Sequence, residues 1–211
     1  MNLAIFDLDN TLLGGDSDFL WGQFLVEKKL VDAIIYEREN QRFYDEYQAG
    51  TLDIYEFLEF SLAPLKQHSI AELDKLHNEF MDTKIATIWL NKAEELLARH
   101  KANNDFLLII TATNHFVTAP IAEKLGVDDI IATMPEQKNN AYTGKVEGMP
   151  CFQDGKVKRL SQWLQKNNYS LENSYFYSDS INDLPLLLEV THPIAVDPDE
   201  KLRKYAEEKG W

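Results

Sequence analysis

Short apolar runs alternate with longer amphipathic stretches along the chain. The first run, Leu3 to Leu8, is apolar except for Asp7, and the second, Phe106 to Ile110, stops at small polar residues. Such runs are typical of strands buried on both faces of a sheet. Shorter candidate strands lie at 130–133, 175–177 and 193–196. Strands that alternate with helices predict an α/β fold with a doubly wound parallel sheet.

Two of the predicted helices carry clear boundary signals. Ser69-Ile-Ala-Glu72 has the pattern of a capping box, in which each residue satisfies a backbone amide of the other. Near the end of the chain, we expect Asp197 to cap a helix that has Pro198 in its first turn. Gly210 is expected to end that helix.

The stretch between the first two predicted strands is too long for one connection. It spans roughly ninety residues, whereas a parallel pair needs only one crossover helix. Residues 14–83 show helical periodicity and are rich in aromatic side chains. We therefore predict an inserted helical cap domain, residues 14–83, over the carboxyl edge of a core domain formed by residues 1–13 and 84–211. The aromatic residues could alternatively form only the core of a small helical bundle.

Composition narrows the classes of partner and the compartment. The 211 residues include 35 acidic and 21 basic side chains, a net charge of −14 that repels nucleic-acid backbones and anionic lipids. No apolar stretch approaches the roughly 20 residues of a membrane span. The single cysteine, Cys151, suits a reducing compartment. We expect a cytoplasmic protein without nucleic-acid or membrane partners, either a monomer or a homodimer.

Polar residues at the end of the first strand are the first candidates for chemistry, because ligands bind at the carboxyl ends of strands in open α/β sheets. The period of a strand is expected to place Asp7 and Asp9 on the same side. Two close carboxylates repel unless a cation or a shared proton neutralises them, which is typical of a metal and proton-transfer site. The alternative is a turn capped by aspartate and completed by Asn10 and Thr11.

The ends of two further strands carry compatible groups. The Thr111 hydroxyl could donate to an oxyanion, and the amides of residues 112–114 lie where a helix should begin. Asp179 and Asp183 could share one face of a helix. Each of these residues could alternatively be a helix cap. Together they indicate an oxygen-only site for a hard cation such as Mg²⁺, with Lys156 or Lys158 as the fixed positive charge.

With these residues in this order, the chain resembles the haloacid dehalogenase superfamily of aspartate-nucleophile phosphohydrolases. The resemblance is to the phosphoserine-phosphatase-like branch with a helical cap in particular. Asp7-Leu-Asp9-Asn-Thr11 is similar to the nucleophile motif of that superfamily, and Thr111 to its second motif. A lysine is similar to the third motif, and Asp179-Ser-Ile-Asn-Asp183 to the acidic fourth motif. The resemblance covers essentially the whole chain.

The same resemblance distinguishes between the two lysines. Phosphoserine-phosphatase-like sequences have an apolar residue four positions after the lysine and the first aspartate of motif four a little over twenty positions after it. Lys156 has Leu160 at +4 and Asp179 at +23, whereas Lys158 has Gln162 at +4. The resemblance therefore favours Lys156 as catalytic and Lys158 as helix surface.

The resemblance also implies a role for each residue. Asp7 would be the nucleophile that forms an aspartyl-phosphate, and Asp9 the general acid and base. Mg²⁺ would be held by the Asp7 carboxylate, the backbone carbonyl of Asp9 and Asp179, with Asp183 and Ser180 supporting these ligands. Thr111 and Lys156 would stabilise the phosphoryl oxygens. The remaining phosphate- or substrate-binding candidates are Asn10, Thr11, Asp16, Ala112, Thr113 and Asn114.

Departures from the family pattern concern the substrate. Phosphoserine phosphatases usually carry a glutamate nine residues after the nucleophile and an arginine in the cap, whereas this chain has Asp16 and no arginine in residues 50–64. Without a cation for the substrate carboxylate, the acidic, aromatic-rich cap favours another small phosphomonoester with an amine-bearing or aromatic alcohol. Histidinol phosphate is our specific hypothesis, and phosphoserine is the alternative.

Two other functions use similar residues. A signalling receiver domain also holds an aspartyl-phosphate with strand-end aspartates, a threonine or serine, a lysine and Mg²⁺. It needs neither a general acid two residues after the phosphorylated aspartate nor a long helical insertion, so Asp9 and residues 14–83 argue against it. Phosphoryl transfer to an acceptor other than water is compatible with the same motifs.

Overall fold

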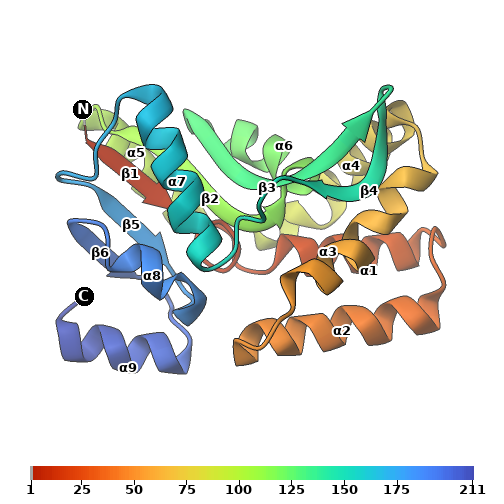
Figure 1. Ribbon diagram of the computed structural model, residues 1–211, viewed down its shortest axis with the longest axis horizontal. Coiled ribbons are helices and arrows are strands. Elements are labelled where there is room, and N and C mark those ends of the chain that lie inside the picture. The colour runs from red at the N-terminus through yellow and green to blue at the C-terminus, as the bar shows by residue number, and fades with distance from the viewer. Residues whose placement is uncertain (1) are drawn as a thin grey trace.

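Six strands form one sheet in the computed structural model, which describes residues 2–211 (Figure 1). The spatial order is β4-β3-β2-β1-β5-β6. All neighbours pair in parallel except β3 and β4, which are antiparallel. The strands are β1 (Leu3–Phe6), β2 (Phe106–Asn114), β3 (Asp129–Lys138), β4 (Ala141–Glu147), β5 (Tyr175–Ser178) and β6 (His192–Ala195).

Most of the helices between β1 and β2 belong to residues 14–83, which we call the cap segment. Its elements are α1 (Ser17–Glu27), α2 (Ala33–Ala49), α3 (Ile54–Leu62), η1 (Ala63–Gln67) and α4 (Ile70–Thr83). The other helices are η2 (Ile85–Ile88), α5 (Asn91–Ala102), α6 (His115–Leu125), α7 (Asp154–Asn167), η3 (Ile181–Asp183), α8 (Leu184–Leu187) and α9 (Glu200–Lys209). No helix in residues 2–211 is long and apolar enough to cross a membrane.

The alternation of side chains in β1 divides the core into two layers, as a doubly wound fold requires. Ala4 and Phe6 belong to a buried cluster that includes residues of α5 and α6. Leu3 and Ile5 belong to a second buried cluster, with residues of α7, α8 and α9. Because both faces of β1 are covered, its sequence is continuously apolar. The fold class expected from the sequence is confirmed.

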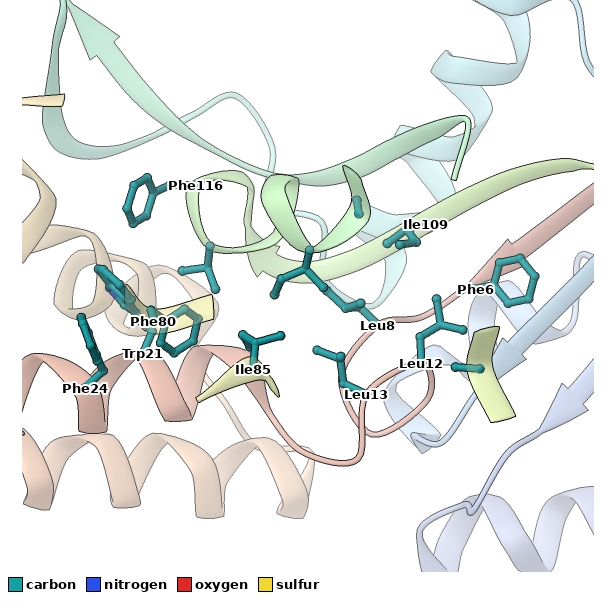
Figure 2. Close-up of a cluster of buried hydrophobic side chains, with 14 of the residues drawn as sticks. Phe6, Leu8, Leu12, Leu13, Trp21, Phe24, Phe80, Ile85, Ile109 and Phe116 are labelled. Atoms are coloured by element: carbon teal, nitrogen blue, oxygen red, sulfur yellow. The ribbon is translucent and has the colours of Figure 1, made fainter. Parts of the chain in front are cut away.

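The hydrophobic cluster on the α5 and α6 side of the sheet continues into the cap segment (Figure 2). Trp21 of α1 contacts the rings of Phe80 and Phe116 edge to face, with ring centroids 5.2 and 5.3 Å apart. Phe80 belongs to α4 and Phe116 to α6, so aromatic side chains join the cap segment to the sheet layer. The division into a core of residues 1–13 and 84–211 and a cap of residues 14–83 stays a prediction.

One strand was absent from the sequence-based expectation. Strand β4 pairs with β3, and their connection is the two-residue turn Asn139-Asn140, in which both residues have positive φ. This hairpin packs on α3 and η1 of the cap segment. Its second strand is polar and only partly buried, so hydrophobicity does not reveal it. The Asn-Asn pair, which suits a type I′ turn, was the available signal.

Of the two helix starts predicted from the sequence, one is confirmed and one is wrong. Ser69 and Glu72 form the predicted capping box at the start of α4. The prediction that Asp197 caps the last helix is wrong, because α9 begins at Glu200 and its cap is Asp199. One oxygen of Asp199 accepts from the Leu202 amide, and the other accepts from the Ile181 amide at 2.6 Å. This second bond joins α9 to η3, a tertiary contact that local sequence does not reveal.

Candidate active site

Asp7 lies just beyond β1, at the carboxyl edge of the sheet. Its backbone amide donates to the carbonyl of Tyr177 in β5 at 2.9 Å. Asp7 and Asp9 line the same pocket, as expected. The period of a strand is not the reason, because β1 ends at Phe6 and both aspartates belong to the connection that follows it. Asp179 directly follows β5 in the neighbouring strand position. The parallel topology thus brings the acidic residues of two distant segments to one edge of the sheet.

Lys156 of α7 joins two of these acidic residues. Its ammonium donates to Asp7 and to Asp183 at 2.8 Å each, and the lysine is only 2 % exposed. Burial opposes the charge of Lys156, yet Asp183 and Asp7 raise its pKa well above the ordinary value. Ser178 donates a further 2.8 Å hydrogen bond to Asp183. Lys156 is therefore a buried cation whose charge is favoured by two neighbouring carboxylates.

A tight turn before α7 places Lys156 at this position. A side chain at Gly155 would lie 2.2 Å from the carbonyl oxygen of Pro150, so only glycine fits there. The preceding Gln153 has a positive φ of 47°, and its side-chain amide donates to Asn182 at 3.2 Å. Lys158, by contrast, is exposed two residues further along the helix. The geometry therefore agrees with the preference for Lys156 over Lys158.

Asp9 is held by two donors from different elements. One of its oxygens accepts from the Ser17 amide at 2.7 Å, and the other accepts from the Thr113 hydroxyl at 2.8 Å. Burial, reinforced by the charge of Asp16, raises the pKa of Asp9 to about 7. A carboxyl group with this pKa can carry a proton at neutral pH and release it again.

Asp179 lies close to Asp7 and Asp183. Burial raises its pKa, and these two like charges act in the same direction. The Thr11 hydroxyl donates to the Asp179 side chain at 3.3 Å. The expectation that Asp179 and Asp183 share a helix face is wrong, because Asp179 precedes the short 3₁₀ turn η3 that ends at Asp183. The turn nevertheless directs Asp183 to Lys156.

The donor set fits a hard cation. The crowded carboxylates Asp7 and Asp179 exceed the single positive charge of Lys156, and oxygen ligands suit Mg²⁺. Within residues 2–211, no three carboxylate, imidazole or thiolate side chains form a metal cage. The expected site needs only two side chains, because the third protein ligand is the backbone carbonyl of Asp9. Burial, together with repulsion from neighbouring carboxylates, raises the pKa of both Asp7 and Asp179, and an ion of this kind would relieve the repulsion.

The second motif contributes three residues to the pocket, namely Thr111, Ala112 and Thr113, and a helix cap, Asn114. Thr111 is buried, and its hydroxyl accepts from the Thr113 amide at 3.2 Å. Ala112 and Thr113 line the same pocket as Asp7. Asn114 is the cap of α6, since its side-chain oxygen accepts from the Val117 amide. The helix-cap interpretation therefore applies to Asn114.

Three other predicted site residues have local structural partners. The Asn10 amide donates to the Gly15 carbonyl at 3.1 Å, so this amide is occupied within the loop. The Ser180 hydroxyl accepts from the Asn182 amide and caps η3, which places it in support of Asp183. Asp16 caps α1 through one oxygen, which accepts from the amides of Asp18 and Phe19. Asp16 also lines the pocket.

A pocket of about 570 Å³, partly open to solvent, extends from Asp7 into the cap segment. Its sheet end consists of Asp7, Asp9, Thr111, Ala112 and Thr113. Its cap end consists of Asp16, Asp18, Phe19, Asn40, Phe43, Tyr44, Tyr47, Leu52, Ile54 and Phe57. Among the described residues, no lysine or arginine lines this pocket. The cap end therefore combines two carboxylates with aromatic and aliphatic side chains.

Sequence reasoning missed several residues that build the site. Ser178 holds Asp183, and Asn182 donates to the Tyr47 carbonyl at 3.0 Å, which joins α2 of the cap segment to η3. Asp18 lines the pocket but received no role. For Ser178 and Asn182 the available signal was their position beside the acidic fourth motif. For Asp18 it was the Asp-Ser-Asp spacing with Asp16.

Comparisons with known proteins agree with this geometry. Residues 4–188 match the model of the haloacid dehalogenase-like hydrolase family. The chain is 46 % identical over 214 residues to a protein of Neisseria meningitidis serogroup C (strain 8013) named histidinol-phosphatase, covering 100 % of this chain and 96 % of the relative. It is 30 % identical over 211 residues to phosphoserine phosphatase SerB1 of Mycobacterium tuberculosis, covering 99 % and 68 % of the two chains.

Solved structures show the same fold. The crystal structure of a protein with unknown function from Bordetella pertussis Tohama I superposes with a TM-score of 0.93 at 44 % identity, covering 100 % of this chain and 96 % of that one. A substrate-bound phosphoserine phosphatase complex superposes with a TM-score of 0.70 at 22 % identity, covering 96 % and 89 %. The second similarity concerns the fold alone.

The chain belongs to the haloacid dehalogenase-like hydrolase family, as its match over residues 4–188 shows. Within that family it is a phosphoric monoester hydrolase, as the phosphatase-named relatives at 46 % and 30 % identity indicate. The recognition made from the four sequence motifs is confirmed. The signalling receiver domain that was weighed from the sequence is a different class of protein.

Proposed function

We propose that this protein is a Mg²⁺-dependent phosphatase that hydrolyses a small phosphomonoester through an aspartyl-phosphate on Asp7. The observation that carries the proposal is the placement of Asp7. It is buried at the carboxyl edge of the sheet, lines the pocket, and contacts Lys156 at 2.8 Å. A carboxylate nucleophile needs a cation beside it to approach an anionic phosphoryl group.

The reaction has two steps. In the first, an Asp7 oxygen attacks phosphorus, the ester P–O bond breaks, and Asp9 gives its proton to the leaving alkoxide oxygen. In the second, Asp9 takes a proton from water, whose oxygen attacks phosphorus and releases phosphate from Asp7. The raised pKa of Asp9, about 7, suits both directions of proton transfer. The hydrogen bonds from Ser17 and Thr113 orient this carboxyl group.

Two side chains and one carbonyl would hold the metal ion. Asp7 and Asp179 supply carboxylate oxygens, the backbone of Asp9 supplies a carbonyl, and Asp183 supports the arrangement through Lys156. When bound, Mg²⁺ neutralises negative charge between the carboxylates and the phosphoryl group. The hydroxyl of Thr111 and the ammonium of Lys156 are the protein donors for the phosphoryl oxygens.

The cap end of the pocket supports an amine-bearing aromatic leaving group, with histidinol phosphate as the specific candidate. Two carboxylates and several aromatic rings line this end. The 46 % identical relative is named histidinol-phosphatase, which favours the same substrate. Phosphoserine is the second candidate, favoured by the name of the 30 % identical relative.

The arginines of the cap segment argue against phosphoserine. Arg42 donates to Glu39, Glu46 and Glu56 on the surface, so its guanidinium is occupied by three carboxylates. Arg38 pairs with Glu39 as well. Among the described residues of the cap segment, neither arginine lines the pocket, so neither is placed to bind a substrate carboxylate.

The test is phosphate release from histidinol phosphate, phosphoserine, a sugar phosphate, a nucleotide and an aryl phosphate, each with Mg²⁺ and with a chelator. We expect metal-dependent release with histidinol phosphate preferred, and recovery of activity when Mg²⁺ replaces the chelator. Equal release with chelator present contradicts the metal requirement. A preference for phosphoserine would favour the second candidate.

A further inference from the structure

Two aspartates lie at the cap end of the pocket, Asp16 just before α1 and Asp18 in its first turn. Their side chains differ in what they contact. One oxygen of Asp16 accepts from the amides of Asp18 and Phe19 at 2.9 and 2.8 Å, so this carboxylate caps the helix. Among the described residues, the Asp18 side chain accepts one hydrogen bond, from the Asn114 side-chain amide at 3.4 Å. Asp18 is thus held weakly, by a neutral group, at the wall of the pocket.

We propose that Asp18, rather than Asp16, binds the positively charged group of the leaving alcohol and so selects cationic phosphomonoesters over neutral ones. This inference rests on the proposed function and specifies the residue that determines its substrate class. Asp16 is the position that the family resemblance had suggested for this contact. The geometry points to Asp18, because one oxygen of Asp16 already accepts two backbone amides at the start of α1, whereas Asp18 accepts a single 3.4 Å hydrogen bond.

The surroundings of Asp18 favour a cation. The described residues that line the pocket include no lysine or arginine, so the protein supplies no positive side chain to this carboxylate there. Burial, with the charges of Asp16 and Asp9, raises the pKa of Asp18 well above its ordinary value. A bound ammonium or imidazolium group would offset this burial and repulsion by pairing with the carboxylate.

Aromatic rings in the same end of the pocket add a second interaction. The rings of Phe19 and Tyr44, which both line the cap end, have centroids 5.1 Å apart. Aromatic faces attract cations, and they also pack well against a planar heterocycle. A leaving group that carries both a positive charge and a ring therefore has partners for each part.

Asn114 connects this contact to the reaction centre. Its side-chain oxygen caps α6, and its amide donates to Asp18, so it has one orientation. Thr113, the residue before it, donates to Asp9. One segment of β2 thus positions both the residue proposed to transfer the proton and the residue proposed to select the alcohol.

The experiment compares Asp18→Asn, Asp18→Glu and the control Glu59→Gln. Glu59 is an exposed residue of α3 outside the pocket, and its substitution removes the same charge. The kcat/KM values are measured for histidinol phosphate and for an aryl phosphate without a positive charge. Equilibrium binding of L-histidinol is measured separately by titration calorimetry, so that the cation contact is tested even if hydrolysis fails.

We expect Asp18→Asn to lower the ratio of the two kcat/KM values by about 10- to 100-fold, mainly through KM, because a charge-assisted hydrogen bond is lost. L-Histidinol binding should weaken by a similar factor. Asp18→Glu should restore part of both, and Glu59→Gln should change neither ratio nor binding by more than about twofold.

Two results would overturn the proposal. Equal losses on both substrates after Asp18→Asn would mean that Asp18 only supports α1. Unchanged histidinol binding in that variant, or no binding by the wild-type protein, would remove the cation contact itself. Failure of the proposed phosphatase function has a different signature, namely histidinol binding that depends on Asp18 without phosphate release from any compound.

Discussion

The carboxylates at the two ends of the pocket have different partners within the protein. At the sheet end, Lys156 lies 2.8 Å from both Asp7 and Asp183, and Asp9 accepts from two fixed donors. At the cap end, Asp18 accepts one 3.4 Å hydrogen bond from a neutral amide. The sheet end is therefore preorganised by the protein, whereas the cap end leaves a carboxylate for a ligand to neutralise.

This contrast separates reaction from recognition. Electrostatic stabilisation of a transition state requires groups whose positions do not change during the reaction, which a buried ion-pair network provides. Selection of a substrate requires buried polar or charged groups of the protein that the correct substrate pairs with and that a wrong substrate leaves unpaired, at a cost in binding free energy. Three predictions test this separation by changing the sheet end or the link between the two ends.

The largest effect is expected for Asp7→Asn. An amide cannot form the acyl-phosphate, so turnover should be abolished, while the nearly identical shape should preserve the fold. Phosphate release measures the first expectation, and circular dichroism with a melting curve measures the second. Mg²⁺-dependent hydrolysis that persists in this variant would refute the assignment of Asp7 as nucleophile.

A smaller but clear effect is expected for Lys156→Ala compared with Lys158→Ala. The first should lower kcat by at least about 10²-fold because it removes a buried donor at the reaction centre. The second should leave kcat almost unchanged, since Lys158 is exposed. Because removing one partner of a buried ion pair destabilises a protein by about 3–5 kcal/mol, kcat is measured well below the melting temperature of each variant. The reverse order of effects would move the catalytic lysine to position 158.

The smallest effect is expected at the link between the ends. Asn182 donates to the Tyr47 carbonyl of α2 from a buried position, and the exposed Lys201 donates to the nearby Ala49 carbonyl, both at 3.0 Å. Asn182→Ala should raise KM about fivefold, because it removes the buried hydrogen bond of about 1 kcal/mol that orients α2 over the site. The substitution also removes the hydrogen bond from Gln153, so Gln153→Ala is measured beside it. Lys201→Met, the matched control, should change KM less than about twofold. Equal effects of the two substitutions would mean that burial of the link is unimportant.

Much of the sheet end could be predicted from the sequence. Apolar runs followed by Asp7, Thr111 and Asp179 indicated strand ends, and parallel strands bring such ends together. The two local geometries inferred for the aspartates were nevertheless wrong. Asp9 lies beyond β1, and Asp179 precedes a short 3₁₀ turn rather than sharing an α-helix with Asp183. These residues nevertheless lie together at one edge of the sheet, because topology, not local periodicity, determines which of them meet.

The cap end was much less predictable. Asp16 and Asp18 have the same side chain and lie two residues apart, and either could cap α1 or line the pocket. The helix begins at Ser17, which commits Asp16 to the cap and leaves Asp18 beside Asn114. The β3-β4 hairpin that packs on α3 was missed for a related reason, since a polar, partly exposed strand has no hydrophobic signature.

The sequence by itself determined the α/β class, the order of the four motifs and the chemical character of the strand ends. These follow from residue types alone, because apolar residues are buried and charged residues mark the ends of buried strands. The family resemblance, rather than the residues alone, favoured Lys156 over Lys158. Only the tertiary structure decided that Asp199 joins α9 to Ile181 of η3, that Lys156 holds Asp183, and that Asp18 lies at the pocket wall. Each of these depends on contacts between segments far apart in the chain, whose distances no local pattern encodes.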